Sequence, residues 1–367
     1  MKPDMPEIME KDPAAATAGD LADMLRCDDR AFVDRLFKAA YRVKAKNVGR
    51  VVHLRGLIEV SNICRCDCFY CGLRVGNKDV SRYRMAAAEV AEAAGWAYRK
   101  GYGSVVLQAG ERRDEEFVGF IEKAVRDMKT KSGGKLGVTL SLGEQEPETY
   151  ARWFSAGAHR YLLRIETSDE AFFRSIHPPE NDFKARLGCL VALREAGYQV
   201  GTGVMVGLPG QTVESLAADI LFFRSFDIDM LGMGPYIPHD STPLAARAVE
   251  YGPDERFNMA LRMIALCRLA MPAINIASTT ALQAMNPKGR ELGLLAGANV
   301  LMPNITPEKY RRDYEIYPGK PCVGDSPDEC ASCLAGRIKS IGETIGYDAW
   351  GDSPHAVERK NREQKRG

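Results

Sequence analysis

The chain has 367 residues, with 50 lysines and arginines against 49 aspartates and glutamates, and 45% of its residues are hydrophobic. This balance excludes a disordered chain, and it excludes a global basic field that would draw the protein onto nucleic acid or an anionic membrane. The sequence holds no apolar run of the roughly 20 residues that a membrane span needs, and the acidic, alanine-rich residues 1–19 do not have the pattern of a secretory signal.

Apolar residues at helical spacing between residues 20 and 46 predict one or two amphipathic helices. From residue 51 onward, short β-rich runs alternate with helical segments. The predicted strands are 51–60, 104–108, 136–142, 160–166, 200–206, 229–237, 273–278 and 299–302. The predicted helices between them are 86–99, 117–129, 147–156, 182–196, 213–226 and 255–271. Eight strands that alternate with helices favour a parallel (β/α)8 TIM barrel, of the α/β class, over an open doubly wound sheet.

The chain divides into three predicted parts. Residues 1–48 form an N-terminal helical extension, 49–305 the barrel, and 306–367 a C-terminal extension. Proline, aspartate, tyrosine and cysteine dominate the composition after residue 303, so we expect that extension to be irregular. We expect the charged residues 357–367 to be mobile.

Seven of the ten cysteines fall in two short windows, at 64–71 and 322–333. Since we expect a cytoplasmic protein, and disulfides are disfavoured in a reducing compartment, clustered cysteines indicate metal. Cys64, Cys68 and Cys71 form C-x3-C-x2-C, which can hold three irons of a four-iron cluster and leave one coordination site open for chemistry. Zinc is the alternative, but it commonly takes a second cysteine pair or a histidine, which this window lacks. We interpret Cys66 as a bystander.

This cysteine spacing, with Tyr70 before the last cysteine, resembles the radical S-adenosylmethionine (SAM) superfamily. Over about residues 40–345 the chain is similar to the branch of biotin synthase, methylornithine synthase and the HydE maturases of iron–iron hydrogenase, and most similar to the HydE maturases. The strings that carry this resemblance are residues 71–74, 107–111, 139–144, 160–164, 205–212, 234–244, 298–304 and 317–320. The resemblance implies a [4Fe-4S] cluster that reductively cleaves SAM to methionine and a 5′-deoxyadenosyl radical.

The resemblance also implies that SAM is bound at the C-terminal ends of successive strands, where barrel enzymes place their chemistry. Glu111 would take the ammonium group, Glu166 the ribose hydroxyls and Arg186 the methionine carboxylate. Thr139 lies two residues before Ser141 and so shares its strand face. The predicted cofactor-binding residues are Tyr70, Gly110, Glu111, Thr139, Ser141, Glu166 and Arg186.

The implied substrate is an iron–cysteine complex that carries CO and cyanide and comes from another maturase; the radical attacks its sulfur to build the diiron precursor. An anionic organometallic ligand fits an arginine, hydroxyl groups and a soft methionine. The predicted substrate residues are Arg164, Tyr236, Thr279, Thr280 and Met302, with His239 on the same wall. Ile165 departs from the pattern of family members that have a histidine there, which leaves the substrate open.

The second window matches a C-terminal cysteine triad that holds an accessory iron–sulfur cluster in some HydE proteins. Its residues are Cys322, Cys330 and Cys333. Three soft ligands favour metal, and whether the site is filled stays open because the triad varies within the family.

Two other functions remain open at this point. One is a HydE-like or methylornithine-synthase-like radical SAM enzyme with a different small substrate; the other is a non-catalytic iron–sulfur carrier. A carrier needs no Glu111, Glu166 or Arg186, so these residues favour an enzyme. The expected partners are a small-molecule or organometallic substrate and transient contacts with other hydrogenase maturases, with no nucleic acid and no membrane.

Overall fold

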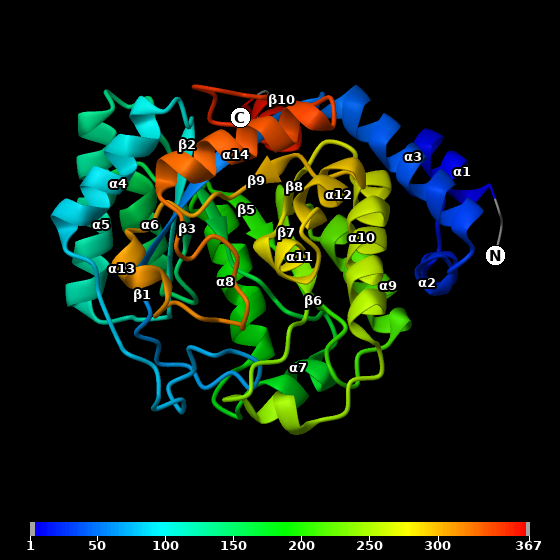
Figure 1. Ribbon diagram of the computed structural model, residues 1–367, viewed down its shortest axis with the longest axis horizontal. Coiled ribbons are helices and arrows are strands. Elements are labelled where there is room, and N and C mark those ends of the chain that lie inside the picture. The colour runs from blue at the N-terminus through cyan, green and yellow to red at the C-terminus, as the bar shows by residue number, and fades with distance from the viewer. Residues whose placement is uncertain (1–3, 365–367) are drawn as a thin grey trace.

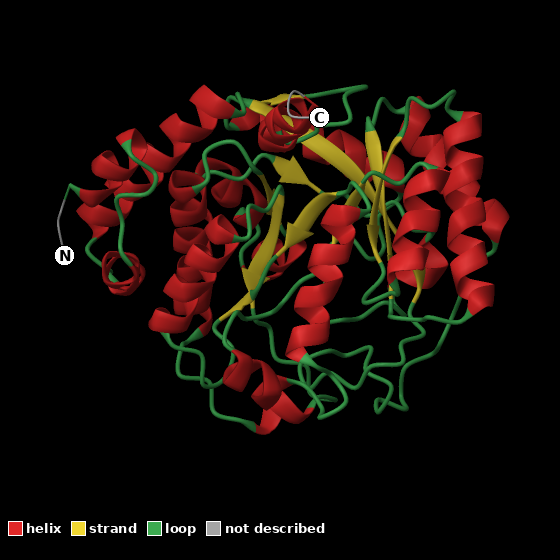
Figure 2. Cartoon of the chain, turned by 180° about the vertical axis from the view of Figure 1, so that it is seen from behind, coloured by secondary structure: helices red, strands yellow, loops and turns green. Residues whose placement is uncertain are grey.

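The computed structural model describes residues 4–364, and its centre is a closed barrel of parallel strands ringed by helices (Figures 1 and 2). Neighbouring strands pair in the order β1-β2-β3-β4-β5-β7-β8-β9, and β1 closes the barrel by pairing His53 with Val300 and Leu54 with Leu301. The strands are β1 (Val51–Ser61), β2 (Ser104–Ala109), β3 (Gly137–Ser141), β4 (Arg160–Leu162), β5 (Gln199–Thr202), β6 (Met205–Val206), β7 (Met230–Pro235), β8 (Asn275–Ser278) and β9 (Val300–Leu301). The predicted TIM barrel is confirmed.

Six of the barrel helices follow the predicted segments closely, and three further helices, at 170–176, 280–285 and 289–295, were not predicted. The barrel helices are α4 (Ala87–Arg99), α5 (Glu115–Lys131), α6 (Pro147–Ala156), α7 (Glu170–Ile176), α8 (Phe183–Glu195), α9 (Val213–Ser225), α10 (Pro253–Ala270), α11 (Thr280–Met285) and α12 (Gly289–Leu295), with a short 3-10 helix at Pro243–Ala246. Local signals set their ends: Asp114 caps α5 by accepting from the amide of Phe117, and α6 ends at Gly157 in the left-handed conformation.

Two predicted strands differ most from their β-rich runs. The strand expected at 160–166 stops at Leu162, and Glu166, further along the same run, has a φ of +62° and is not in the extended conformation. The strand expected at 200–206 is split into β5 and β6 around Gly203, where a Cβ atom would lie 2.1 Å from the carbonyl oxygen of Gly232. A single bridge between Glu166 and Val204 joins the two broken strands.

The N-terminal extension has three helices, α1 (Met5–Lys11), α2 (Ala18–Arg26) and α3 (Arg30–Asn47). They contact α9 and α10 on the outside of the barrel. Helix α1 was not predicted; it is stabilised by burial of Met5 and Met9.

The C-terminal extension is more regular than we expected. It forms α13 (Glu308–Arg311), α14 (Pro327–Ser340), β10 (Thr344–Ile345) and α15 (Pro354–Gln364), and β10 pairs in parallel with β1. Ser326 and Glu329 form a capping box that starts α14. Residues 357–364, which we expected to be mobile, form most of helix α15. His355 and Arg359 tie this helix to the barrel, since both contact Asp229 (2.9 and 2.8 Å); residues 365–367 lie outside the described range.

Residues 346–353 cross the N-terminal end of the barrel and close it. Arg160 donates from Nη1 to the carbonyl of Trp350 (2.9 Å) and to Asp352 (2.6 Å). The opposite end, where the strand C-termini and the loop 62–86 lie together with α7, is the lower end in Figure 1.

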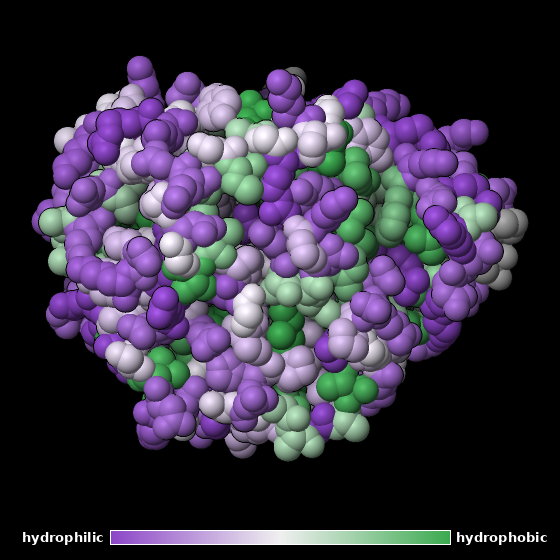
Figure 3. Space-filling model, viewed as in Figure 1, coloured by the Kyte–Doolittle hydropathy of each residue, from purple (hydrophilic) through white to green (hydrophobic). Residues whose placement is uncertain are grey.

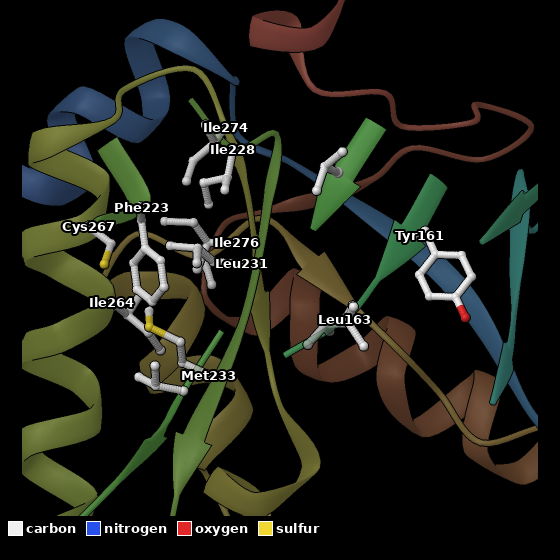
Figure 4. Close-up of a cluster of buried hydrophobic side chains, with 14 of the residues drawn as sticks. Tyr161, Leu163, Phe223, Ile228, Leu231, Met233, Ile264, Cys267, Ile274 and Ile276 are labelled. Carbon is white, nitrogen blue, oxygen red and sulfur yellow. The ribbon is translucent and has the colours of Figure 1, made fainter. Parts of the chain in front are cut away.

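A hydrophobic layer between the strands and the helices fixes this arrangement. Figure 4 shows Phe223 of α9 and Cys267 of α10 beside Leu231 and Ile276 of the barrel strands; all four are buried. The face in Figure 3 is mostly hydrophilic, with hydrophobic residues in small groups. No helix within residues 4–364 combines the length and the apolar character needed to cross a membrane.

Candidate active site

The first cysteine window forms a loop at the C-terminal end of β1. Cys64, Cys68 and Cys71 follow closely after the strand ends at Ser61. The amide of Cys71 donates to the carbonyl of Cys68 (3.3 Å), and the amide of Cys66 donates to Sγ of Cys64 (3.4 Å). These bonds fold the window back on itself, and all of its cysteines line one cavity.

Arg82 holds the cysteine loop in shape. Its Nη1 donates to the carbonyls of Asn62 and Leu73 (2.7 and 2.9 Å), and its Nη2 donates to the carbonyls of Arg74 and Asn77 (2.8 and 3.1 Å). One guanidinium therefore satisfies four carbonyls of an irregular segment. Nothing in the sequence marks Arg82 for this function, since it lies outside the cysteine motif.

Gly110 lets the end of β2 approach the cysteine loop. A Cβ atom at this position would lie 2.5 Å from the carbonyl oxygen of Ile63 and 2.7 Å from Cβ of Cys64. Such distances do not occur between real side chains and backbone, so only glycine fits without a shift of the loop. The structure thus gives Gly110 a steric reason to be glycine.

The cavity has a volume of about 300 Å³ and lies at the C-terminal ends of the strands. It brings together most of the predicted residues, which are Cys64, Cys68, Tyr70, Cys71, Gly110, Glu111, Ser141, Arg164, Glu166, Arg186, Tyr236, Thr279, Thr280 and Met302. Cys66 lines it as well.

Two predicted residues lie elsewhere. Thr139 is buried in the barrel interior, where its Oγ1 accepts from Nε of Arg160 (2.9 Å), and it lines a separate small cavity below the site. His239 does not line the cavity; it lies against Gly72, where a Cβ atom would come within 2.6 Å of the imidazole. The structure therefore brings neither side chain to the site.

Glu166 is the most constrained residue of the cavity wall. It is one of four residues other than glycine with positive φ within residues 4–364, a conformation that is strained for such a side chain. Its Oε1 contacts Nη2 of Arg164 (3.0 Å), while its buried Oε2 has no hydrogen-bond partner among the described residues. Burial raises the pKa of Glu166, and Arg164 and Arg186 oppose the shift. An unpaired carboxylate oxygen on a residue of the cavity wall is suited to accept from a ligand hydroxyl.

Arg186 and Glu144 form a charged pair beside this wall. Nε of Arg186 lies 2.5 Å from Oε1 of Glu144, and Nη1 donates to the carbonyl of Arg164 (2.6 Å). The third nitrogen, Nη2, makes no hydrogen bond to residues 4–364, so it is open to a ligand carboxylate.

Glu111 stands in the same network. Its Oε2 accepts from the amide of Glu144 (2.9 Å), and its Oε1 lies 3.3 Å from Nη2 of Arg113. Because the side chain is only 7% exposed, these contacts fix the carboxylate at the cavity wall. An anionic group in that position can bind an ammonium ion.

Tyr70 is oriented by His177. Nδ1 of His177 lies 2.9 Å from the carbonyl of Phe173 and so carries the proton. Nε2 is then the acceptor for the Tyr70 hydroxyl (3.0 Å). Burial lowers the pKa of His177 to about 3, which keeps the ring neutral. The hydroxyl of Tyr70 is thus occupied, and its ring contributes to the cavity wall.

The sequence analysis missed the C-terminal part of the wall. Lys320 pairs with Glu59 at the cavity wall, and both side chains are buried. The hydroxyl of Tyr317 lies 2.8 Å from Oγ1 of Thr280. Residues 317–320 belong to the strings shared with the family, and this was the one signal that pointed to them. Nothing else in the sequence assigned these residues to the cavity.

The cysteine loop fits an iron–sulfur cluster better than a single ion. Within residues 4–364, three potential ligand atoms within 4.8 Å of one another occur at Cys322, Asp325 and Cys330, and not at Cys64, Cys68 and Cys71. A wider triad of thiols suits a polynuclear cluster. Burial raises the pKa of Cys71 to about 12, so this thiol needs a cation beside it to ionise.

The second window is only partly assembled. Sγ of Cys330 lies 3.7 Å from Oδ2 of Asp325, and the hydrogen bond from Cys330 lowers the pKa of Cys322 to about 7. Cys333 is exposed and does not join this group. The structure thus puts a carboxylate where the sequence predicted a third thiol.

A barrel with three cysteines on the loop after its first strand, opening onto a cavity with two fixed carboxylates and an arginine, defines a radical SAM enzyme. The sequence agrees, since residues 58–223 match the family described as Radical SAM superfamily.

The chain is similar to several known proteins, and one of them, a hydrogenase maturase subunit, narrows the class. The chain is 45% identical to the [FeFe] hydrogenase maturase subunit HydE of Thermotoga maritima, over 96% of this chain and 98% of the relative. It is 27% identical to the biotin synthase of Magnetococcus marinus, over 78% of this chain and 89% of the relative. The crystal structure of a methylornithine synthase has the same fold, with a TM-score of 0.79 and 22% identity over 94% of this chain and 98% of that one. The chain belongs to the HydE family of radical SAM enzymes.

Proposed function

We propose that this enzyme acts in assembly of the diiron cofactor of [FeFe] hydrogenase, by radical attack on the sulfur of an iron–cysteine complex that carries CO and cyanide. The observation that carries the proposal is the 45% identity to a HydE subunit over nearly the whole chain, together with a cavity that joins the cysteine loop to charged and hydroxyl side chains.

Cys64, Cys68 and Cys71 would hold the [4Fe-4S] cluster. When bound, the cluster supplies the electron that cleaves SAM to methionine and a 5′-deoxyadenosyl radical. Glu166 accepts from the ribose hydroxyls through its unpaired Oε2, and Arg186 offers Nη2 to the methionine carboxylate.

Glu111 attracts the ammonium group of SAM, and the Gly110 backbone keeps the strand end close to the cysteine loop. Ser141 lines the cavity, where its hydroxyl would reach SAM. These contacts orient SAM before any electron moves, which is how a binding site lowers a barrier.

The far part of the cavity suits an anionic substrate. Arg164 and Lys320, which pair with Glu166 and Glu59, are cations on its wall. The hydroxyls of Tyr236 and Thr279 are buried without partners among the described residues, so both can donate to a ligand. Met302 adds a soft sulfur.

Ile165 does not weaken the proposal. Its side chain is fully buried in the hydrophobic core and is not part of the cavity wall. In this chain the residue at position 165 therefore does not contact a ligand in the cavity.

For the second cysteine window we propose an accessory metal centre held by Cys322 and Cys330. Cys333 lies one helical turn from Cys330 on α14, and Asp325 is the alternative third ligand because it already contacts Cys330. Iron–sulfur analysis of Cys333→Ala and Asp325→Ala proteins separates these two ligand sets.

We propose a cytoplasmic enzyme that makes transient contacts with other hydrogenase maturases. A maturase whose substrate comes from another protein would receive it by such contacts. The exposed thiol of Cys333 is compatible with a reducing compartment.

The test is to supply substrate candidates to the cluster-loaded enzyme under strict anaerobiosis. An iron–cysteine complex with CO and cyanide ligands should raise the rate of 5′-deoxyadenosine formation from SAM. Stimulation by amino acids instead would favour a methylornithine-synthase-like enzyme, and failure to bind SAM would favour a carrier.

A further inference from the structure

Asp219 is a buried carboxylate that the proposed chemistry does not use. It lies on α9 with no exposed surface. Its Oδ1 accepts from both the amide and the hydroxyl of Ser168, each at 2.6 Å, while its Oδ2 has no partner among the described residues. Burial raises the pKa of Asp219 to about 7. A buried acid with one unsatisfied oxygen is unfavourable, so its presence needs an explanation.

Ser168 lies two residues after Glu166, whose left-handed backbone is strained. Such a conformation persists only when its surroundings fix it on both sides. On the N-terminal side, the amide of Glu166 donates to the carbonyl of Gly203 (3.1 Å) and the amide of Ile165 donates to Oγ1 of Thr202 (3.2 Å). On the C-terminal side, the bonds from Ser168 to Asp219 tie the segment to another element.

Helix α9 gives Asp219 a rigid base. Phe223, one helical turn further along, lies in the core beside Cys267 and Ile264 of α10 (Figure 4). The titratable groups that interact electrostatically with the Asp219 carboxylate are Asp169 and Cys267. Neither is a cation, so the bonds from Ser168 are its main compensation.

We propose that Asp219 is a positioning residue for SAM binding: it holds Ser168, and through it the strained Glu166, so that the free Oε2 of Glu166 faces the cavity. The inference rests on the proposed contact between Glu166 and the ribose of SAM.

The test measures the Kd of SAM for the cluster-loaded protein by anaerobic titration calorimetry. Asp219→Ala should raise the Kd about tenfold or more, since small displacements of a positioning contact have large effects. Asp219→Asn should have a Kd within about threefold of the wild-type value, because its side-chain amide oxygen still accepts hydrogen bonds from Ser168.

Two controls separate positioning from folding. Asp229 is also fully buried but holds α15 at the opposite end of the barrel, so Asp229→Asn should lower Tm and leave the Kd unchanged. In a Glu166→Ala background, Asp219→Ala should add less than about twofold to the Kd, because the two residues act through one contact.

An Asp219→Ala protein that is less stable but binds SAM normally overturns the inference. If that variant does not fold, Ser168→Ala decides: it removes one of the two bonds to Asp219, and an unchanged Kd overturns the inference, whereas a rise of about threefold supports it. An unchanged Kd in Glu166→Ala overturns the proposed ribose contact and this inference with it. If Glu166→Ala raises the Kd of SAM but Asp219→Ala leaves it unchanged, the inference about Asp219 is overturned while the proposed ribose contact stands.

Discussion

A buried ion pair joins the two extensions of the barrel. Nζ of Lys44 on α3 lies 3.1 Å from Oε2 of Glu343, just before β10, and both side chains are 0% exposed. Lys44 also donates to the carbonyl of Leu294 (3.0 Å), and the hydroxyl of Tyr41 donates to Glu343 (2.6 Å). Burial lowers the pKa of Lys44 to about 8, although Glu343 opposes the shift.

Glu343→Leu would leave Lys44 buried without its counter-ion. Breaking a buried pair in this way costs about 3–5 kcal/mol. Alternatively, Lys44 can lose its proton, which at pH 7 costs about 5 kcal/mol for a lysine with an ordinary pKa near 10.4. Both estimates of the loss in the free energy of unfolding therefore fall in the same range. The double variant Lys44→Met, Glu343→Leu replaces the pair by apolar groups and should recover most of the loss.

The assay is urea unfolding followed by circular dichroism, at pH 7 and across the alkaline range. Because the folded pKa of Lys44 is lowered, the unfolded chain binds more protons between pH 8 and 10.5. The contribution of Lys44 to wild-type stability should therefore rise with pH in that window, and Lys44→Met should lose this rise. A Glu343→Leu protein within about 0.5 kcal/mol of wild type, or a double variant no more stable than the single one, would refute the reasoning.

Three further changes test other parts of the account. Hydrogen bonding to Asp229 raises the pKa of His355, so its stabilisation is complete below pH 6.5 and lost as pH rises through the folded pKa; His355→Asn should lower Tm more at pH 6 than at pH 9, and equal losses would contradict this. Gly110→Ala would place a Cβ atom 2.7 Å from Cβ of Cys64 and should reduce iron bound on reconstitution; full iron content would show that the loop can yield. Cys330→Ala should lose accessory metal but cleave SAM almost normally, and an inactive protein would mean that the second window supports the reaction.

The strand pattern predicted where the site loops would lie, because parallel strands bring their C-terminal ends to one side of a barrel. The cysteine spacing predicted the metal loop, whereas the functions of the carboxylates came from the family resemblance. Thr139 shows the limit of this reasoning. Thr139 does lie on the same strand face as Ser141, but side chains fill a barrel interior in successive layers. Thr139 lies in the layer below the cavity, where its hydroxyl accepts a hydrogen bond from Arg160 of the next strand.

Contacts between distant segments could not be predicted. Glu59 and Lys320 meet although 261 residues separate them, and neither residue type stands out in its own segment. Helix α15 was missed for a similar reason, since its charged sequence is stabilised by Asp229 of the barrel rather than by an apolar face. Tertiary contacts overrode composition in both cases.

The central claim is that Cys64, Cys68 and Cys71 hold a cluster that opens onto a SAM site. The most direct measurement is 5′-deoxyadenosine, quantified by chromatography after anaerobic reconstitution with iron and sulfide and addition of dithionite and SAM. The account predicts product from the wild-type protein and from Cys66→Ala, and none from Cys64→Ala, Cys68→Ala or Cys71→Ala. Continued product formation in any of those three variants would contradict it.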